Sequence, residues 1–367
     1  MKKTDVFVVG GGPSGLAAAI ALRRKGASVV VADSAHPAID KTCGEGLMPN
    51  ARTALAQLGI PVPDDVGVPF RGICFRNAHT AASAHFTQGD GLGVRRTVLH
   101  NLLVDQARAL GVTLLWGTHV RFTGQGGLFA GETQWQAQWT IGADGQRSRV
   151  RQFAGLDQGR STQRFGIRQH FRIAPWNDCV EVTWAREGQA YVTPTRHDEV
   201  CVALLMEDKH FRFANLAKVF PGLAARLEGH APTSTERGAL TVSRRLPRVT
   251  HGNIALIGEA SGSVDAITGE GLALSFQQAI ALVGAIAAGD LSQYERRHRE
   301  IFRVPTRMSQ LLVFLGRHPQ MQARILGAFH KDASLFSHLL GVHLGQRPPL
   351  AIHPNSLWQF GRNLVTR

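Results

Sequence analysis

The N-terminal part of the chain alternates short apolar runs with a helix-forming stretch. Residues 6–9 are β-branched and aromatic, which predicts a buried strand. Residues 16–25 are rich in alanine and leucine and precede Gly26, so we expect a helix that ends there. Residues 29–32 predict a second buried strand. This order predicts the first strand–helix–strand unit of a parallel sheet with helices on its faces.

Further along the chain, helical and strand-like periods alternate. Residues 49–58 and 94–110 carry apolar side chains at helical spacing and predict two helices. Between them, residues 71–86 form short alternating segments that predict antiparallel strands. Residues 112–124 predict a strand that returns to the first sheet, and residues 124–138 predict a hairpin that follows it.

The second half of the chain contains a different kind of sheet. Residues 165–174 and 180–206 alternate and are rich in β-branched side chains, which predicts a mainly antiparallel sheet. Residues 253–286 return to the order strand, loop and long helix. The last part predicts amphipathic helices, at residues 308–316, 321–330 and 335–344.

These elements predict an α/β protein with a discontinuous nucleotide-binding domain. We assign residues 1–70, 95–165 and 245–300 to that domain. Residues 71–94 and 166–244 form the predicted substrate domain, and residues 301–367 form a helical C-terminal region.

Composition is that of an ordinary globular protein, with 44% hydrophobic and 19% charged residues among 367. No apolar run approaches the ~20 residues that span a bilayer, and the chain enters its first strand without a signal-peptide pattern. The four cysteines are scattered, without metal-site or disulfide-framework spacing. These features predict a cytoplasmic protein with reduced thiols and no metal site.

The formal net charge is +14, and much of the excess is C-terminal. From Leu291 to the end there are eleven Lys or Arg and three Asp or Glu. No nucleic-acid-binding module accompanies this charge, so we predict no nucleic-acid partner. A basic face exposed to solvent is one interpretation. A reduced nicotinamide dinucleotide, an acidic carrier protein and an anionic membrane surface, contacted peripherally through this region, are the others.

A glycine-rich turn follows the first strand. Gly10, Gly12 and Gly15 have the G-x-G-x-x-G spacing, and Asp33 stands at the end of the second predicted strand. Such glycines permit a tight turn, a close approach of backbone to pyrophosphate, and close packing of helix on strand. The carboxylate lies near the position that accepts hydrogen bonds from ribose hydroxyls. We therefore predict a bound dinucleotide, although this motif leaves NAD and FAD open.

Two further motifs follow in order along the chain. Residues 141–145 place Asp144 and Gly145 after an apolar strand. Glu259 follows the next strand, and Gly269 and Gly271 frame a turn that opens a helix. The amides of that helix N-terminus would stabilise negative charge on a reduced flavin ring but not a cationic nicotinamide ring.

Together these three stretches resemble the fingerprints of FAD-dependent oxidoreductases of the para-hydroxybenzoate hydroxylase-like superfamily, over residues 6–287. That superfamily includes aromatic monooxygenases and geranylgeranyl reductases. Three positions depart from its usual pattern: Glu259 replaces an aspartate, Ala266 a proline, and Gly262 the histidine of the hydroxylases. The missing histidine favours the reductase-like branch.

The resemblance implies a set of residues that contact FAD. An arginine that opens the long helix often reaches the pyrophosphate or ribose in this superfamily, and Arg95 and Arg96 both stand there. The predicted cofactor-binding residues are Gly10, Gly12, Pro13, Ser14, Gly15, Asp33, Ser34, Gly44, Glu45, Gly46, Arg95, Arg96, Val120, Asp144, Gly145, Gly258, Glu259, Gly269, Gly271 and Leu272.

The segment Lys41–Ala51, with Cys43-Gly44-Glu45-Gly46, resembles a flavin-adjacent loop of geranylgeranyl reductase-like proteins. Cys43 and Glu45 are therefore candidate catalytic residues, which could tune the flavin or relay a proton. A packed small side chain and a loop carboxylate are the alternatives. His170 and Tyr191 are candidate substrate contacts, with a solvent-facing strand position and core packing as their alternatives.

The resemblance implies an FAD-dependent oxidoreductase that takes electrons transiently from NAD(P)H. The leading hypothesis is a monooxygenase that hydroxylates or epoxidises an apolar aromatic or polyketide-like small molecule of secondary metabolism, free or carrier-bound. The alternative is a reductase of a C=C bond in an isoprenoid or polyketide chain. A third hypothesis is a flavin-binding or electron-transfer protein without turnover, which would consume no NAD(P)H.

Overall fold

The computed structural model describes residues 1–123 and 127–348. The N-terminal unit lies as predicted: β1 (Lys2–Val9), α1 (Pro13–Arg24) and β2 (Val29–Ala32). β1 and β2 pair in parallel, and all four residues of β2 are buried. A buried, parallel strand is apolar on both faces, which is why these runs show no alternation.

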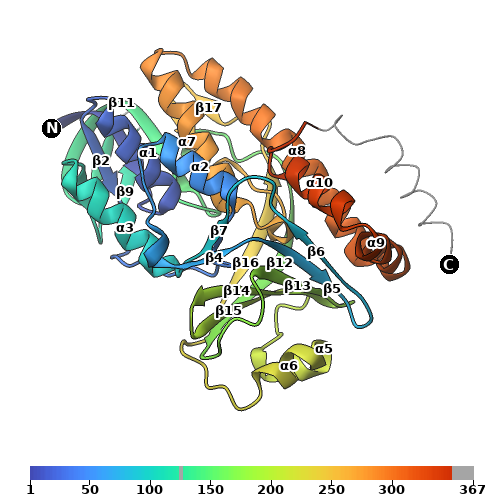
Figure 1. The fold of residues 1–367 in the computed structure, drawn as a ribbon. Helices are drawn as coiled ribbons and strands as arrows, with labels where there is room; N and C mark the ends of the chain where they lie inside the picture. The colour runs from blue at the N-terminus through green and yellow to red at the C-terminus, as the bar shows by residue number, and fades with distance from the viewer. Residues whose placement is uncertain (124–126, 349–367) are drawn as a thin grey trace.

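In the described residues, eight strands form the first sheet, and its central path runs β17-β18-β11-β1-β2-β8. These strands are β17 (Thr250–His251), β18 (Ile254–Leu256), β11 (Thr133–Gly142) and β8 (Thr113–Leu115) besides β1 and β2. β1, β2, β8, β11 and β18 are parallel, so their carboxyl ends meet at one edge. Helices cover this sheet, above all α1, α3 (Arg96–Ala109) and α7 (Gly271–Ala287) (Figure 1).

The single strand that the sequence predicts over 112–124 is two strands. β8 joins the parallel sheet, whereas β9 (Val120–Phe122) pairs with β10 (Leu128–Ala130) in an antiparallel hairpin beside β11. Gly117, at a φ of 65°, turns the chain between them. Residues 124–126 of the predicted hairpin lie outside the described residues.

A second sheet has the mainly antiparallel character that the sequence predicts. Its order is β16-β12-β15-β14-β13-β5-β6, and only β13 and β5 pair in parallel. The strands are β5 (Gly72–Arg76), β6 (Ala81–His85), β12 (Arg160–Phe171), β13 (Cys179–Trp184), β14 (Gly188–Arg196), β15 (Glu199–Met206) and β16 (Arg237–Arg245). The α/β fold class with a second, antiparallel layer is confirmed.

Smaller elements connect the two sheets or cover their ends. A three-stranded sheet lies beside α2 (Pro49–Gln57), and it contains β3 (Gly46–Leu47), β7 (Gly91–Gly93) and β4 (Val68–Phe70). The short helices are α4 (Arg149–Phe153), α5 (Leu216–Val219), α6 (Pro221–Leu227) and the 3₁₀ turns η1 (Asp64–Val66), η2 (Phe213–Asn215), η3 (Gly258–Ser261) and η4 (Ala266–Thr268).

The C-terminal helices are α8 (Leu291–Arg317), α9 (Pro319–Lys331) and α10 (Ala333–His343). They pack against the second sheet through stacked rings, with Phe336 contacting both Phe75 and Phe329. The predicted helix at 308–316 is the end of the longer α8, which continues through Pro305. The last part of the predicted helical region, 349–367, lies outside the described residues.

His298 fixes α8 against the first sheet. Its ring is buried, lies 3.0 Å from the hydroxyl of Ser261 in η3, and stacks on Phe302. Burial lowers the pKa of His298 to about 4 from its ordinary 6.5, with a smaller opposing contribution from Glu295. The ring is therefore neutral in the folded protein.

We predict that this histidine makes the fold sensitive to acid. Because the folded pKa is lowered, the stabilisation is present above pH 6.5 and is lost as the pH falls towards 4. One group with this shift accounts for about 3 kcal/mol over that window. Urea unfolding of the wild type and His298→Gln across this range should give free-energy curves that converge at low pH. Parallel curves would contradict the assignment.

Candidate active site

A single cavity of about 1300 Å³ runs from the carboxyl edge of the first sheet to the second sheet and the C-terminal helices. Ligand pockets usually have about 300–1,000 Å³, so this one can hold more than one drug-sized molecule. Three turns that follow β1, β11 and β18 line its first end. They contribute Gly12, Asp144 and Gly258 respectively.

The three glycines of the first turn have different surroundings. A Cβ on Gly10, which has a φ of 111°, would lie 2.3 Å from the carbonyl oxygen of Ala143. A Cβ on Gly15 would lie 2.0 Å from the carbonyl oxygen of Gly10. A Cβ on Gly12 would meet nothing within 4 Å, and this residue lines the cavity. Gly10 and Gly15 therefore permit close packing, whereas Gly12 leaves space for a ligand.

Two buried polar atoms beside this turn lack a partner. Asp144 accepts hydrogen bonds from the amides of Arg149 and Val150 through Oδ2, while its Oδ1 has none. Nε of Arg96 is also buried without a partner, and both residues line the cavity. The first amides of α1 have no side-chain cap. An unpaired cation beside free helix amides fits a pyrophosphate, and the unpaired Oδ1 of Asp144 fits a hydroxyl of a polyhydroxylated group of FAD.

The start of α7 forms the second glycine turn of the cavity. Gly269 has a φ of 68°, and a Cβ on Gly271 would meet nothing within 4 Å. Between them, Glu270 is 2% exposed and lies 3.3 Å from Nε2 of His343 on α10. Burial raises the pKa of Glu270, and His343 opposes that shift. This arrangement joins the C-terminal helices directly to the turn that the resemblance assigns to the flavin ring.

The loop that holds Cys43 and Glu45 closes one side of the cavity. Glu45 has a φ of 59°, which is strained for a residue with a side chain, and is 3% exposed. Its carboxylate accepts a hydrogen bond from the amide of Arg96 at 3.0 Å and lies 2.6 Å from Nε2 of His170. Arg168 is 3.5 Å from the same carboxylate. These contacts hold the loop in place.

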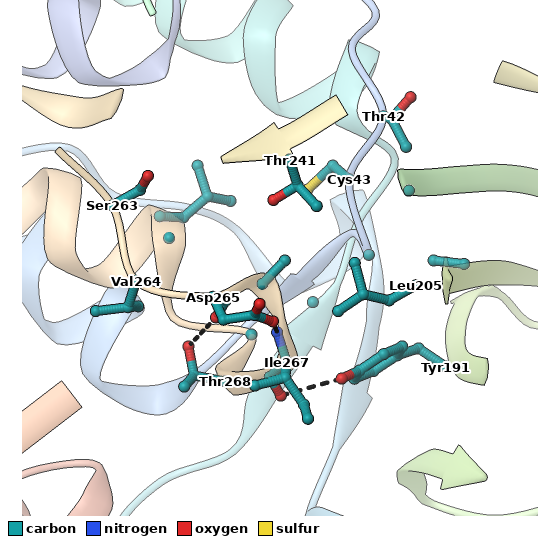
Figure 2. A pocket seen from close by; sticks show the side chains of 18 of the residues that line it. Thr42, Cys43, Tyr191, Leu205, Thr241, Ser263, Val264, Asp265, Ile267 and Thr268 are labelled. Carbon is teal, nitrogen blue, oxygen red and sulfur yellow. Dashed lines mark hydrogen bonds between the residues drawn. The ribbon is translucent and has the colours of Figure 1, made fainter. Parts of the chain in front are cut away.

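Around the middle of the cavity, polar and apolar side chains face each other across a narrow space, as Figure 2 shows. Tyr191 donates a hydrogen bond from its hydroxyl to the carbonyl oxygen of Ile267 at 3.1 Å. Burial raises the pKa of Tyr191, so its hydroxyl stays protonated. Asp265 accepts from the amide of Ile267 and contacts Arg164 at 3.2 Å. Cys43 lies on the opposite wall.

The far end of the cavity is apolar. It is lined by the inner faces of β5, β13 and the C-terminal helices, with Ile73, Phe75, Val180, Val182, Trp184, Met308, Leu311, Leu312, Leu315, Ile325, Leu326, Phe329, Phe336, Leu339 and Leu340. This surface would bury a ring with an attached chain. The binding free energy becomes more favourable by roughly 25 cal/mol for each Å² of apolar area removed from water.

Most of the predicted site residues line this one cavity. They are Gly12, Pro13, Ser14, Cys43, Gly44, Glu45, Gly46, Arg96, Asp144, Gly145, Tyr191, Gly258, Glu259, Gly269, Gly271 and Leu272. Those that lie outside its lining are Gly10, Gly15, Asp33, Ser34, Arg95, Val120 and His170.

Several of these outlying residues have structural partners. Asp33 accepts from the amides of Gly11 and Ala35, one on each oxygen, and each oxygen retains a second lone pair. Arg95 forms a two-point ion pair with Glu199, whereas its neighbour Arg96 faces the cavity. Of the two arginines, Arg96 is therefore the one placed to meet a ligand.

Two more of them pack elsewhere, one partly and one completely buried. Val120 packs against the core of the first sheet. His170 is completely buried beneath Glu45, with Nδ1 2.9 Å from the hydroxyl of Ser234. It does not stand on a solvent-facing strand surface, as one interpretation of the sequence has it, and it reaches the cavity only through Glu45.

One departure from the family pattern, Gly262, has a local steric explanation. A Cβ on Gly262, where hydroxylases carry histidine, would lie 2.6 Å from the carbonyl oxygen of Arg244. Glu259 is exposed and accepts from the side-chain amide of Gln146 at 3.2 Å. Residues that sequence analysis did not select include Glu270, His343 and the pair Arg164–Asp265, because only the tertiary fold brings each next to its partner.

Comparisons with known proteins agree with this geometry. The family model described as "FAD binding domain" matches residues 3–290. The ubiquinone hydroxylase UbiL of Rhodospirillum rubrum is 26% identical, with 95% of this chain and 92% of that protein aligned. The menaquinone reductase of Mycolicibacterium smegmatis is 44% identical over 71 residues, which is 19% of this chain and 17% of the reductase.

Among solved structures, p-nitrophenol 4-monooxygenase PnpA from Pseudomonas putida superposes with a TM-score of 0.81 at 20% identity, covering 95% of this chain and 100% of that one. This likeness shows the fold. Because the family model matches most of its length, the chain belongs to the FAD-binding domain family.

We predict that Gly12→Ala separates cofactor binding from folding. Gly12 has a φ of −72°, which alanine adopts without strain, and its Cβ would point into open space. The apoprotein should keep its melting temperature, while the FAD dissociation constant rises at least about tenfold because the backbone no longer approaches the pyrophosphate. Circular dichroism and a fluorescence titration measure the two quantities.

Gly15→Ala is the matched control, since it adds the same methyl group where the carbonyl oxygen of Gly10 is in the way. This variant should lose stability as well as FAD binding. A Gly12→Ala protein that binds FAD like the wild type would show that the cofactor does not approach this turn.

Proposed function

We propose that this chain is an FAD-dependent monooxygenase that acts on an apolar, ring-containing small molecule and takes its electrons from NAD(P)H. The main support for the proposal is that the glycine turns and the apolar wall line one continuous cavity. Its glycine turns have the space and free amides for FAD, and its far end is lined by apolar side chains of the second sheet and of three helices. A ring held between these ends would lie near Tyr191 and Cys43.

In this proposal, bound FAD supplies hydride acceptance from NAD(P)H and activation of O₂. One oxygen atom enters the substrate and the other leaves as water, with NAD(P)H and a proton consumed. The chain's own residues bind the cofactor and orient the substrate towards it. Arg96 and the start of α1 hold phosphates, the start of α7 faces developing negative charge, and the apolar wall excludes water. The extent of alignment with a ubiquinone hydroxylase supports this reaction class.

A reductase of a C=C bond is the second candidate, and a specific observation favours it. Reduction needs a proton donor besides hydride, and the cavity offers two groups for that role, the Cys43 thiol and the Tyr191 hydroxyl. The raised pKa of Tyr191 keeps this hydroxyl protonated. The match to a menaquinone reductase supports this class as well.

We also propose a cellular compartment for this protein and a way in which it receives its substrate. All four cysteines are free, which suits a reducing compartment such as the cytoplasm. In the described residues, no helix has the length and apolar character needed to cross a membrane. We propose an apolar substrate of secondary metabolism, presented free, on a carrier or from a membrane.

The two reactions are distinguished by the fate of oxygen. With a panel of alkylated phenols, quinones and polyprenyl compounds, we expect substrate-stimulated NAD(P)H oxidation that requires O₂. Mass spectrometry under ¹⁸O₂ should show a product with one labelled oxygen atom. Anaerobic formation of a product that has gained two hydrogens would contradict the monooxygenase hypothesis and support the reductase. FAD binding without NAD(P)H consumption would indicate the flavoprotein without turnover.

Tyr191→Phe gives an independent test of the reaction class. If the hydroxyl only positions Ile267, turnover should stay within about tenfold of the wild type. If it donates the proton in a reduction, kcat should fall by about 10²–10⁴. The control is Tyr294→Phe, which removes the other tyrosine hydroxyl of the chain, a buried group bonded to Leu256 outside the cavity. We expect the smaller effect for both variants.

A further inference from the structure

One stretch of the C-terminal helices combines positive charge with exposed apolar side chains. Residues 301–331 contain five Lys or Arg and no Asp or Glu. All five cations are exposed: Arg303, Arg307, Arg317, Arg324 and Lys331. Of the large hydrophobic residues that are exposed in the described chain, three belong to this stretch, Leu311 at 47%, Phe314 at 42% and Met321 at 45%.

These side chains share one face of α8. Arg303, Arg307, Leu311 and Phe314 follow one another at intervals of four, four and three residues, which places them in a row along a helix. Arg317 follows three residues later and contacts Glu207 at 4.0 Å. Met321 begins the next helix, α9, directly after the turn at His318. We call this row, with Met321, Arg324 and Lys331, the basic–apolar face.

The other side of the same helices is the apolar wall of the cavity. Leu312, Leu315 and Leu326 are buried and line it. Leu311 lines the cavity and also belongs to the basic–apolar face. The C-terminal part of α8 and the helix α9 thus lie between the binding cavity and the outer surface, and α9 lies at the end of the molecule away from the first sheet (Figure 1).

We infer that the basic–apolar face docks on an anionic lipid bilayer, with α8 and α9 lying along the membrane surface. We also infer that apolar substrates enter the cavity from the bilayer. Exposed leucine, phenylalanine and methionine would insert among acyl chains, while the arginines reach lipid phosphates. The stretch 301–331 contains no acidic residue, and Glu207 is the carboxylate that contacts one of its cations, Arg317, in the described structure. The remaining cations of the face complement a bilayer that carries negative charge. The docking stands on this surface alone, whereas substrate entry rests on the proposed function.

Nucleic acid fits this face less well, because its phosphates would meet the cations but leave the three large apolar side chains in water. An acidic carrier protein offers the same charge complementarity, and the experiment separates it from lipid. The contact is peripheral, since none of the described helices can cross a bilayer.

Flotation of the FAD-loaded protein with phosphatidylcholine vesicles, with and without phosphatidylglycerol, tests the inference. We expect binding to the anionic vesicles that weakens as salt is added, and little binding to the neutral ones. Arg303→Gln with Arg307→Gln should weaken binding about thirtyfold, at about fivefold for each cation. Phe314→Ser with Met321→Ser should also weaken it, with less dependence on salt.

The matched control is Arg24→Gln with Lys25→Gln, which removes two exposed cations at the end of α1, in the other half of the molecule. All variants should retain FAD content and melting temperature, because none of these side chains lines the cavity. Equal loss of binding in the control, or binding to neutral and anionic vesicles alike, would overturn the inference. So would an absence of vesicle binding together with salt-sensitive binding to an acyl carrier protein.

This test is independent of turnover. If the vesicles bind but no substrate is oxidised or reduced, the proposed function fails and the docking stands. If turnover occurs without vesicle binding, the docking fails alone.

Discussion

The site depends on how closely the turn after β1 approaches the end of β11. Gly10 packs against the backbone at Ala143, and Gly15 packs against the carbonyl oxygen of Gly10, at separations that leave no room for a Cβ. This contact sets α1 on the sheet and brings the turns with Asp144 and Gly258 to one edge. Gly258 in turn leaves room for Ser14, because a Cβ on it would lie 2.4 Å from that hydroxyl. Without these contacts, three separate turns would not enclose one cavity.

The second constraint is the attachment of the C-terminal helices to this edge. α8 is fixed through His298 on Ser261, and α10 through His343 on Glu270, so both helices contact turns that line the cavity. Because interiors are closely packed, a shift of α10 would be transmitted to the start of α7. The helices therefore complete the site as well as cover the second sheet, and their inner face decides which apolar molecules fit.

The sequence predicted a residue's surroundings well where its partners are close in sequence, and poorly where they are distant. The roles of Gly10, Gly12 and Gly15 follow from spacing within one turn, and in the structure Gly10 and Gly15 pack closely while Gly12 borders open space. Arg95 and Arg96 are adjacent and equivalent in sequence. Long-range partners distinguish them, because Arg95 pairs with Glu199, more than a hundred residues away, and also donates a hydrogen bond to Thr233. Such long-range partners leave no periodic signal in a single sequence.

Errors in element boundaries have a related physical cause. Residues 112–124 have one continuous strand-like pattern, and the break at Gly117 arises from a positive φ that the pattern does not encode. Pro305 favours ending a helix, yet α8 continues through it because tertiary packing outweighs local preference. Arg168 and His170 alternate like solvent-facing residues. They are buried because Glu45, on a distant loop, provides the polar partner that burial requires.

The polarity of the cavity also constrains the orientation of its ligand. Free helix amides, Arg96 and Asp144 gather at one end, and the other end is lined by apolar side chains of β13, α8 and α9. A ligand with a polar head and an apolar tail binds best with its head in the polar end and its tail in the apolar end of the cavity. An unpaired polar group in the apolar end would cost about 1–3 kcal/mol of binding free energy. If FAD occupies the polar end, as proposed, the reactive part of a substrate would lie between Tyr191 and the turn before α7, with its apolar part towards α8. An apolar part longer than the cavity would then extend towards Leu311, the position at which the cavity wall meets the basic–apolar face.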